Sequence, residues 1–350
     1  MNRITLLAIL LLITSILVSA STITVNTIST ASGPSYGVYA DGKIIIVAQG
    51  AFELQCIENN TIVNTIPLPH DPADPFKVAY DQGYLFVIYQ KGPLVVLKDG
   101  KVISTYNIPH VGKYPDILTA GKYVAVTASN GYKVYFFTPS GEIGSVSVEP
   151  NPQALAYDNY TNTIYVGAYG YNVIDGISLS TMKVTQQIKI NATVVDTMTF
   201  VPPDLLAVAT YNQQVEFINV TSGKVVATAS FSPPDTGIFG YSQITYDPAD
   251  GYVLLSIAHH NDLVAVISTN GEVKYLVTVG NSPNGIIFDP QNNYVYVLNY
   301  GSNSISYFLS PNITTHTVST SSNFTLLYMV VVVIIILLVV GGIVAFRRRK

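Results

Sequence analysis

Histidine and tyrosine side chains are the residues of this sequence that could bind a ligand or a metal ion. The histidines outside the C-terminal tail are His70, His110, His259 and His260. Four tyrosines end apolar, strand-like runs, namely Tyr89, Tyr169, Tyr211 and Tyr300. Imidazole can ligate a metal or exchange a proton, whereas a tyrosine ring can stack on a sugar or peptide and donate a hydrogen bond.

The spacing of these residues matches no catalytic or metal-binding motif. The sequence contains no His-Glu-x-x-His, no Gly-x-Ser-x-Gly, no phosphate-binding glycine loop and no haem-attachment cysteine pair. The segment from Asp247 to Gly251 is expected to form a hairpin turn rather than a calcium loop. We therefore expect no metal and no cofactor, and we assign no catalytic residue. Carboxylates on separate loops could still catalyse a reaction without forming a motif.

Composition limits the kinds of partner. Residues 21–325 hold all 21 Asp and Glu, whereas five of the 17 Lys and Arg lie at the two ends of the chain. A net negative surface repels phosphate backbones, so we expect no nucleic-acid partner. Cys56 is the single cysteine, which excludes an intrachain disulfide. Charged residues are only 11% of the chain, and we interpret this as a sign of an acidic habitat.

The N-terminal residues resemble a targeting segment. Arg3 precedes an apolar run, residues 4–18, and small residues follow as far as Ala20. This order is typical of a secretory signal peptide, predicted here for residues 1–20. An uncleaved anchor helix is the alternative for the same run.

The C-terminal residues predict a membrane anchor. Residues 326–346 carry no charge, and at 1.5 Å per residue they would span roughly 31 Å, about one hydrocarbon core. Four basic residues, 347–350, follow directly. Because basic residues stay on the cytoplasmic side, residues 21–309 are expected outside the cell, joined to the membrane by a Ser/Thr-rich stalk, residues 310–325.

Two markers recur in phase along the chain. Turns containing glycine between β-rich runs occur at Gly100, Gly141, Gly223 and Gly271. Apolar runs ending near an aromatic residue and an acid occur at Tyr80, Tyr157, Tyr246 and Phe288, with degenerate copies at Tyr39, Leu118 and Phe200. Seven repeats of about forty residues, each with about four strands, predict an all-β, seven-bladed β-propeller. A pair of β-sandwiches and an open β-solenoid are the alternatives.

The last repeat lacks a fourth strand, and the N-terminal segment offers one. The tetrapeptide Val-Asn-Thr-Ile occurs at residues 25–28 and again at residues 63–66, where the fourth strand of the first full repeat is expected. Residues 25–28 are therefore predicted to complete the seventh blade. Closing the ring in this way would cover edge hydrogen-bonding groups that an open ring exposes.

The last repeat also resembles a known family. Residues 282–308 read SPNGIIFDPQNNYVYVLNYGSNSISYF, which is similar to the YVTN-type β-propeller repeat of archaeal and bacterial cell-surface proteins. Residues 151–174 resemble the same repeat, and the rest of the chain does so loosely. Leu298 replaces the usual Thr, and Tyr307 and Phe308 replace Ile-Asp. The resemblance implies a seven-bladed propeller and an external location, but no fixed activity.

Propeller geometry sorts the candidate residues onto two faces. One face holds the loops between blades and the loops between second and third strands, and we call it the mouth face. The other face holds the remaining turns, and we call it the hairpin face. All the candidate histidines and tyrosines are expected on the mouth face. The Asn-x-Ser/Thr glycosylation sequons are at Asn59, Asn159, Asn191, Asn219, Asn312 and Asn323. The first, second and fourth are expected on the hairpin face, the third on the mouth face and the last two in the tail.

These expectations combine into a binding protein. A ring of aromatic residues around a central opening suits sugars or peptides through stacking and hydrogen bonding. We expect a single-pass glycoprotein of the cell surface that binds or scaffolds an envelope protein, a surface-layer subunit or a glycan. The alternatives are an extracytoplasmic propeller enzyme, a hydrolase or lyase with its site at the central mouth, and a subunit of a membrane complex.

Overall fold

The computed structural model describes residues 23–191, 195–210, 214–230, 243–258 and 262–311 of the 350-residue chain. The side chains of Val195 and Asp196 are outside this description. The strands belong to the compact unit Met1–Ser310. No helix in the described ranges is long and apolar enough to cross a membrane. The predicted signal peptide, residues 1–20, and the predicted spanning segment, residues 326–346, lie outside those ranges.

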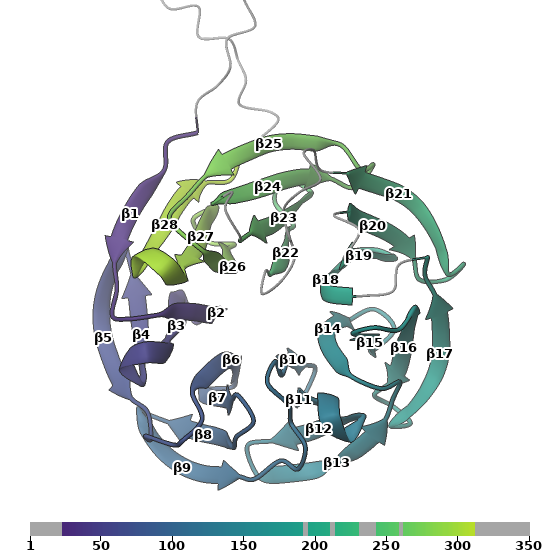
Figure 1. The fold of residues 1–350 in the computed structure, drawn as a ribbon, viewed down its shortest axis with the longest axis horizontal. Coiled ribbons are helices and arrows are strands. Elements are labelled where there is room, and N and C mark those ends of the chain that lie inside the picture. The colour runs from purple at the N-terminus through teal and green to yellow at the C-terminus, as the bar shows by residue number, and fades with distance from the viewer. Residues whose placement is uncertain (1–22, 192–194, 211–213, 231–242, 259–261, 312–350) are drawn as a thin grey trace, which may run out of the picture. The chain divides into compact units, whose positions relative to one another are not determined.

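The described strands form seven four-stranded antiparallel sheets arranged as blades around an axis, as Figure 1 shows. Blade 1 is β2 (Pro34–Ala40), β3 (Lys43–Ala48), β4 (Glu53–Glu58) and β5 (Thr61–Pro67). Blade 2 is β6 (Pro75–Asp81), β7 (Tyr84–Tyr89), β8 (Leu94–Lys98) and β9 (Lys101–Tyr106). Blade 3 is β10 (Ile117–Ala120), β11 (Tyr123–Ala128), β12 (Lys133–Thr138) and β13 (Gly141–Ser147).

The remaining blades repeat this arrangement. Blade 4 is β14 (Pro152–Asp158), β15 (Thr163–Ala168), β16 (Val173–Ser178) and β17 (Lys183–Lys189). Blade 5 is β18 (Val195–Val201), β19 (Leu205–Thr210), β20 (Gln214–Asn219) and β21 (Lys224–Ser230). Blade 6 is β22 (Ile244–Asp247), β23 (Tyr252–Ile257), β24 (Leu263–Ser268) and β25 (Val273–Thr278). Blade 7 has β26 (Pro283–Asp289), β27 (Tyr294–Asn299) and β28 (Ser304–Leu309) from the C-terminal end of the propeller.

The seventh blade is completed by the N-terminal strand β1 (Asn26–Ser29), which confirms the prediction of ring closure. β1 pairs with β28 in antiparallel register, with Ile28 opposite Ile305. Figure 1 shows the purple β1 beside the yellow-green β28. The observed strand begins one residue later than the predicted segment and includes Ser29. The prediction of an all-β, seven-bladed propeller is confirmed for the described residues, in which the only helices are the 3-10 turns η1 (Gln49–Ala51), η2 (Ser129–Gly131) and η3 (Tyr300–Ser302).

Alternating burial along the strands produces the core. The middle two strands of each blade are buried on both sides, as in Ile44 to Ala48 of β3, because neighbouring blades cover both faces. The outer strands alternate between buried and exposed side chains, as in β17. Apolar clusters therefore lie between successive blades, and burial of this apolar area provides the main stabilisation of the ring.

Buried aspartates shape the turns between the first and second strands. Asp289 accepts hydrogen bonds from the backbone N–H groups of Gln291 at 2.9 Å and Asn292 at 3.3 Å. Asp158 and Asp247 bind the backbone of their own turns in the same manner. Three of the four aromatic-acid pairs of the sequence are thus turn anchors, since a short acidic side chain mimics part of the turn backbone.

Removing such an anchor is expected to destabilise the propeller. Asp289→Ala should lower the free energy of unfolding by about 1–2 kcal/mol, because the turn N–H groups lose a charged acceptor. Glu142→Ala, at an exposed position of β13, is the matched control and should change it by less than about 0.5 kcal/mol. Urea unfolding followed by circular dichroism measures both. Equal losses in the two variants would contradict the anchoring role.

Candidate functional site

A pocket of about 370 Å³ lies on the mouth face of the propeller. We call it the mouth pocket. It is lined by residues of blades 1, 2, 3, 6 and 7 and the loops beside them, namely Gln49, Asp74, Phe76, Gln90, Lys113, Tyr114, Ala258, Ser282, Asn284 and Tyr300. Its volume falls within the range of small-molecule sites, roughly 300–1,000 Å³.

Three side-chain amides in the mouth pocket have no hydrogen-bond partner among the described residues. Gln49, Gln90 and Asn284 line it, and their amide groups make no hydrogen bond to any residue that the structure describes. Gln49 is only 8% exposed. Each amide can both donate and accept a hydrogen bond. The pocket is therefore equipped to exchange hydrogen bonds with a polar ligand.

Aromatic rings provide the other part of the mouth pocket. Tyr300, in η3, is 41% exposed. Its ring lies against Gly33, where an added Cβ would come within 3.1 Å of Tyr300 Cε2, so the loop backbone supports the ring. Phe76 and Tyr114 are a tilted pair with centroids 6.3 Å apart, and Lys113 Nζ is 4.9 Å from the Tyr114 centroid. The rings offer apolar faces beside the polar amides.

The structure places the predicted tyrosines in different environments. Tyr300 lines the mouth pocket, whereas Tyr169 is 39% exposed but does not line it. Tyr89 is fully buried and donates a hydrogen bond to the carbonyl of Pro69 at 2.9 Å. Burial, assisted by the charge of Asp71, raises the pKa of Tyr89. Tyr89 thus packs inside blade 2, and Tyr211 lies outside the described residues.

The predicted histidines do not line the mouth pocket where the structure describes them. His70 is exposed and stacks on Phe52 with centroids 4.5 Å apart. His110 is exposed, has a positive φ of 59°, and its carbonyl accepts a hydrogen bond from Asn130 N. His259 and His260 lie outside the described residues. Among the residues described, no group of three or more His, Cys, Asp or Glu is placed to hold a metal ion.

The predicted glycosylation sites differ in exposure. Asn59, Asn159 and Asn191 are exposed. Asn219 is half-buried, and its amide donates to Asp204 Oδ2 at 2.5 Å. Asn312 and Asn323 lie outside the described residues. Ser310, which the sequence reading assigned to the stalk, is buried, and its hydroxyl donates to Asp247.

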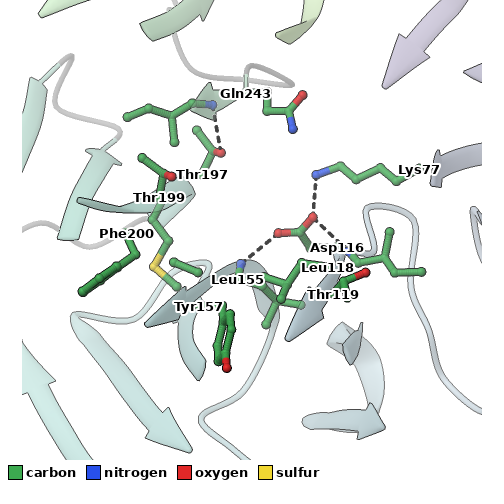
Figure 2. Close-up of a pocket in the computed structure, with 14 residues that line it drawn as sticks. Lys77, Asp116, Leu118, Thr119, Leu155, Tyr157, Thr197, Thr199, Phe200 and Gln243 are labelled. Carbon is green, nitrogen blue, oxygen red and sulfur yellow. Dashed lines mark hydrogen bonds and ion pairs between the residues drawn. The ribbon is translucent and has the colours of Figure 1, made fainter. Parts of the chain in front are cut away.

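A second cavity, about 280 Å³, lies among the innermost strands of blades 2 to 6, and we call it the axial channel. Figure 2 shows its lining. Lys77 Nζ forms an ion pair with Asp116 Oδ1 at 2.9 Å and lies 4.3 Å from the centroid of the Tyr36 ring. Asp116 Oδ2 also accepts a hydrogen bond from Leu155 N of the next blade at 2.8 Å.

Side chains at the axis join further blades to one another. Thr197 Oγ1 accepts a hydrogen bond from Ile244 N at 3.3 Å, and Gln243 Oε1 accepts one from Ile286 N at 3.0 Å. Each bond joins a side chain in, or directly before, the innermost strand of one blade to the backbone of the next blade. The axial channel therefore contributes to the cohesion of the ring, and its polar side chains are held in fixed positions.

Sequence reasoning missed the amides of the mouth pocket. Gln49 and Gln90 directly follow second strands, just as Tyr300 does. The tyrosines were chosen as candidates because they lie at the ends of second strands, and these two glutamines lie there too. Position in the repeat, rather than residue type, could therefore have identified the amides. Asn284 occupies the second position of an innermost strand, which no motif marks.

Comparison with known proteins supports the fold alone. No protein-family model matches the sequence, and no curated protein is significantly similar to it. Among solved structures, virginiamycin B lyase from Staphylococcus aureus is 17% identical with a TM-score of 0.71, covering 83% of this chain and 100% of the lyase. A streptogramin B lyase is 15% identical, with a TM-score of 0.70 and coverage of 82% and 97%.

A third similar structure is the hydrazine synthase of Kuenenia stuttgartiensis. It is 14% identical with a TM-score of 0.70, and the match covers 84% of this chain and 99% of that one. These proteins have different activities, and their low identity shows a shared architecture rather than a shared function. The chain therefore has the fold class of a seven-bladed β-propeller that structurally resembles the lyases.

Proposed function

We propose that this protein is a surface-anchored binding module that recognises a neutral glycan at its mouth pocket. The observation that carries the proposal is a set of three amides without a described hydrogen-bond partner, beside the exposed ring of Tyr300; the amides are those of Gln49, Gln90 and Asn284. Sugar hydroxyls both donate and accept hydrogen bonds, as side-chain amides do, and sugar C–H faces stack on aromatic rings.

Charge also favours a neutral ligand. The mouth pocket contains one acidic residue, Asp74, and one basic residue, Lys113, so its lining has no net formal charge. A strongly anionic or cationic partner would find little electrostatic complementarity there. A glycan of the cell envelope is the partner class that fits this lining together with the predicted external location and membrane anchor, residues 326–346.

A glycan microarray tests this proposal with the full-length chain and two tyrosine variants. Tyr300→Ala should reduce the signal at least tenfold on every glycan that binds, because the stacking ring is lost. Tyr160→Ala is the matched control, since Tyr160 is 67% exposed and lies in the turn between β14 and β15 on the hairpin face. The control should bind like the wild type.

Each other outcome has a definite meaning. Equal losses in the two variants would place binding away from the mouth pocket. The wild type could bind no glycan but capture a peptide or a surface-layer protein that Tyr300→Ala does not capture. That result would support the mouth pocket as the binding site and reject glycans as the ligand class. Absence of any ligand would reject the proposal.

A further inference from the structure

The axial channel contains hydrogen-bond donors for which the described part of the chain provides no acceptor. Lys77 Nζ has three N–H bonds and makes one hydrogen bond to a described residue, Asp116. Gln243 is held through Oε1, and its Nε2 donates to no residue that the structure describes. Thr199 lines the same cavity, and its hydroxyl has no described partner. These donors can therefore bind an acceptor on a ligand.

Two acceptors in the axial channel, the Asp116 carboxylate and the Thr197 hydroxyl, already accept hydrogen bonds from the protein. Asp116 accepts three hydrogen bonds, from Lys77 Nζ, Ile117 N and Leu155 N. Thr197 Oγ1 accepts one from Ile244 N. A ligand rich in donors would therefore find few partners here, whereas a ligand that supplies oxygen acceptors would match the lining.

Partial burial strengthens the attraction for an anionic group. The side chains of Lys77 and Asp116 are only 15% and 16% exposed. A charge shielded from water acts on a nearby ligand more strongly than one at the surface. Because Asp116 offsets the charge of Lys77, the preference for a carboxylate comes from the N–H donors that have no described acceptor rather than from a net positive charge.

We propose that the axial channel binds a small monocarboxylate. Its oxygens accept hydrogen bonds from Lys77 Nζ and Gln243 Nε2, and a further oxygen accepts one from Thr199 Oγ1. Figure 2 shows the side chains of Lys77 and Gln243 facing the same open space above Asp116. The axial channel and the mouth pocket share no lining residue, and the proposal for the channel does not depend on glycan binding at the mouth pocket.

Isothermal titration calorimetry of the full-length chain with L-lactate tests the proposal. Propane-1,2-diol is the matched uncharged probe, because it replaces the carboxylate of lactate by a hydroxymethyl group. At constant ionic strength set with chloride, lactate should bind saturably at least about tenfold more tightly than the diol, since hydrogen bonds to a charged group are the stronger ones.

Two variants test the assigned contacts without removing the bonds between blades. Gln243→Glu keeps an acceptor for Ile286 N but replaces the donor by a carboxylate oxygen, and should weaken lactate binding at least about tenfold. Thr199→Val removes only a hydroxyl without a described partner, and should weaken it about threefold to tenfold. Tyr300→Ala, in the mouth pocket, should leave it unchanged.

The contrary results are equally specific. Equal affinity for lactate and the diol, or absence of saturable lactate binding, would overturn the proposal. Unchanged lactate affinity in Gln243→Glu would also overturn it. Loss of glycan binding in Tyr300→Ala with lactate binding intact would support the two sites independently.

Discussion

A chain that begins at residue 31 is expected to be less stable than a chain that begins at residue 23 by on the order of 5 kcal/mol. The difference between them includes strand β1, which pairs four residues with β28 and places Ile28 against the core cluster containing Ile305 and Leu298. Without β1, the edge of β28 loses its hydrogen-bond partners and the ring is no longer closed through the chain ends.

Urea unfolding followed by circular dichroism measures this difference. Because a loss of stability this large can prevent the shorter chain from folding, substitutions in the complete chain provide a second test. Ile28→Ala should cost about 1–2 kcal/mol because Ile28 is half-buried. Ser29→Ala, at an exposed position of the same strand, should cost less than about 0.5 kcal/mol. Equal stability of the two truncated chains would show that β1 does not close the ring.

The propeller is expected to gain stability as the pH falls from 7 toward 4. Burial raises the pKa of Asp81, Glu216 and Asp247 above their usual values of 3.8, 4.5 and 3.8. A carboxyl whose pKa is raised on folding binds protons more readily in the folded state than in the unfolded state. Its stabilising effect is therefore complete below the unfolded pKa and is lost as the pH rises through the folded pKa.

Glu216 offers the sharpest single test of this pH dependence. It is 6% exposed on β20, and its Oε2 atom has no hydrogen-bond partner among the described residues. Glu216→Gln removes the buried charge and keeps the shape, so it should stabilise the protein by about 1–2 kcal/mol at pH 7. At pH 4 the variant and the wild type should differ little, because the wild-type carboxyl is then protonated.

Glu142→Gln is the control for Glu216→Gln, because Glu142 occupies an exposed position of β13. Chemical unfolding of all three proteins at pH 4, 5, 6 and 7 measures the effect. A constant difference between Glu216→Gln and the wild type at every pH would contradict the account, as would a stability that falls on acidification. The predicted direction agrees with our interpretation of the low charge content as a sign of an acidic habitat.

The architecture could be predicted from the sequence because the strands and turns of a propeller blade depend on residues that are close together in the chain. Glycine turns and aromatic-acid pairs recur with the period of one blade, and the structure gives both a role in turns, as at Asp289. Ring closure was also predictable, because residues 25–28 repeat a fourth-strand segment. These features depend on residues near one another in the chain, which is where sequence patterns are most informative.

The sites were harder to predict because they combine residues from many blades. The mouth pocket brings Gln49 of blade 1 together with Tyr300 of blade 7, and the axial channel brings Lys77 beside Asp116. Which way a side chain points at the axis depends on blade packing, and no spacing in the sequence encodes it. Tyr89 shows the same limit, since the sequence analysis grouped it with Tyr300, but it is the last residue of β7, one position earlier in its blade than Tyr300, and it is buried.

Hydrogen–deuterium exchange with and without the best glycan from the array tests the central claim most directly. The account predicts slower exchange in the presence of glycan for the backbone around Gln49, Gln90 and Asn284. Exchange on the hairpin face, including the turn at Tyr160, should remain unchanged. Protection confined to the hairpin face, or no protection in any described segment, would contradict the claim that the mouth pocket is the glycan-binding site.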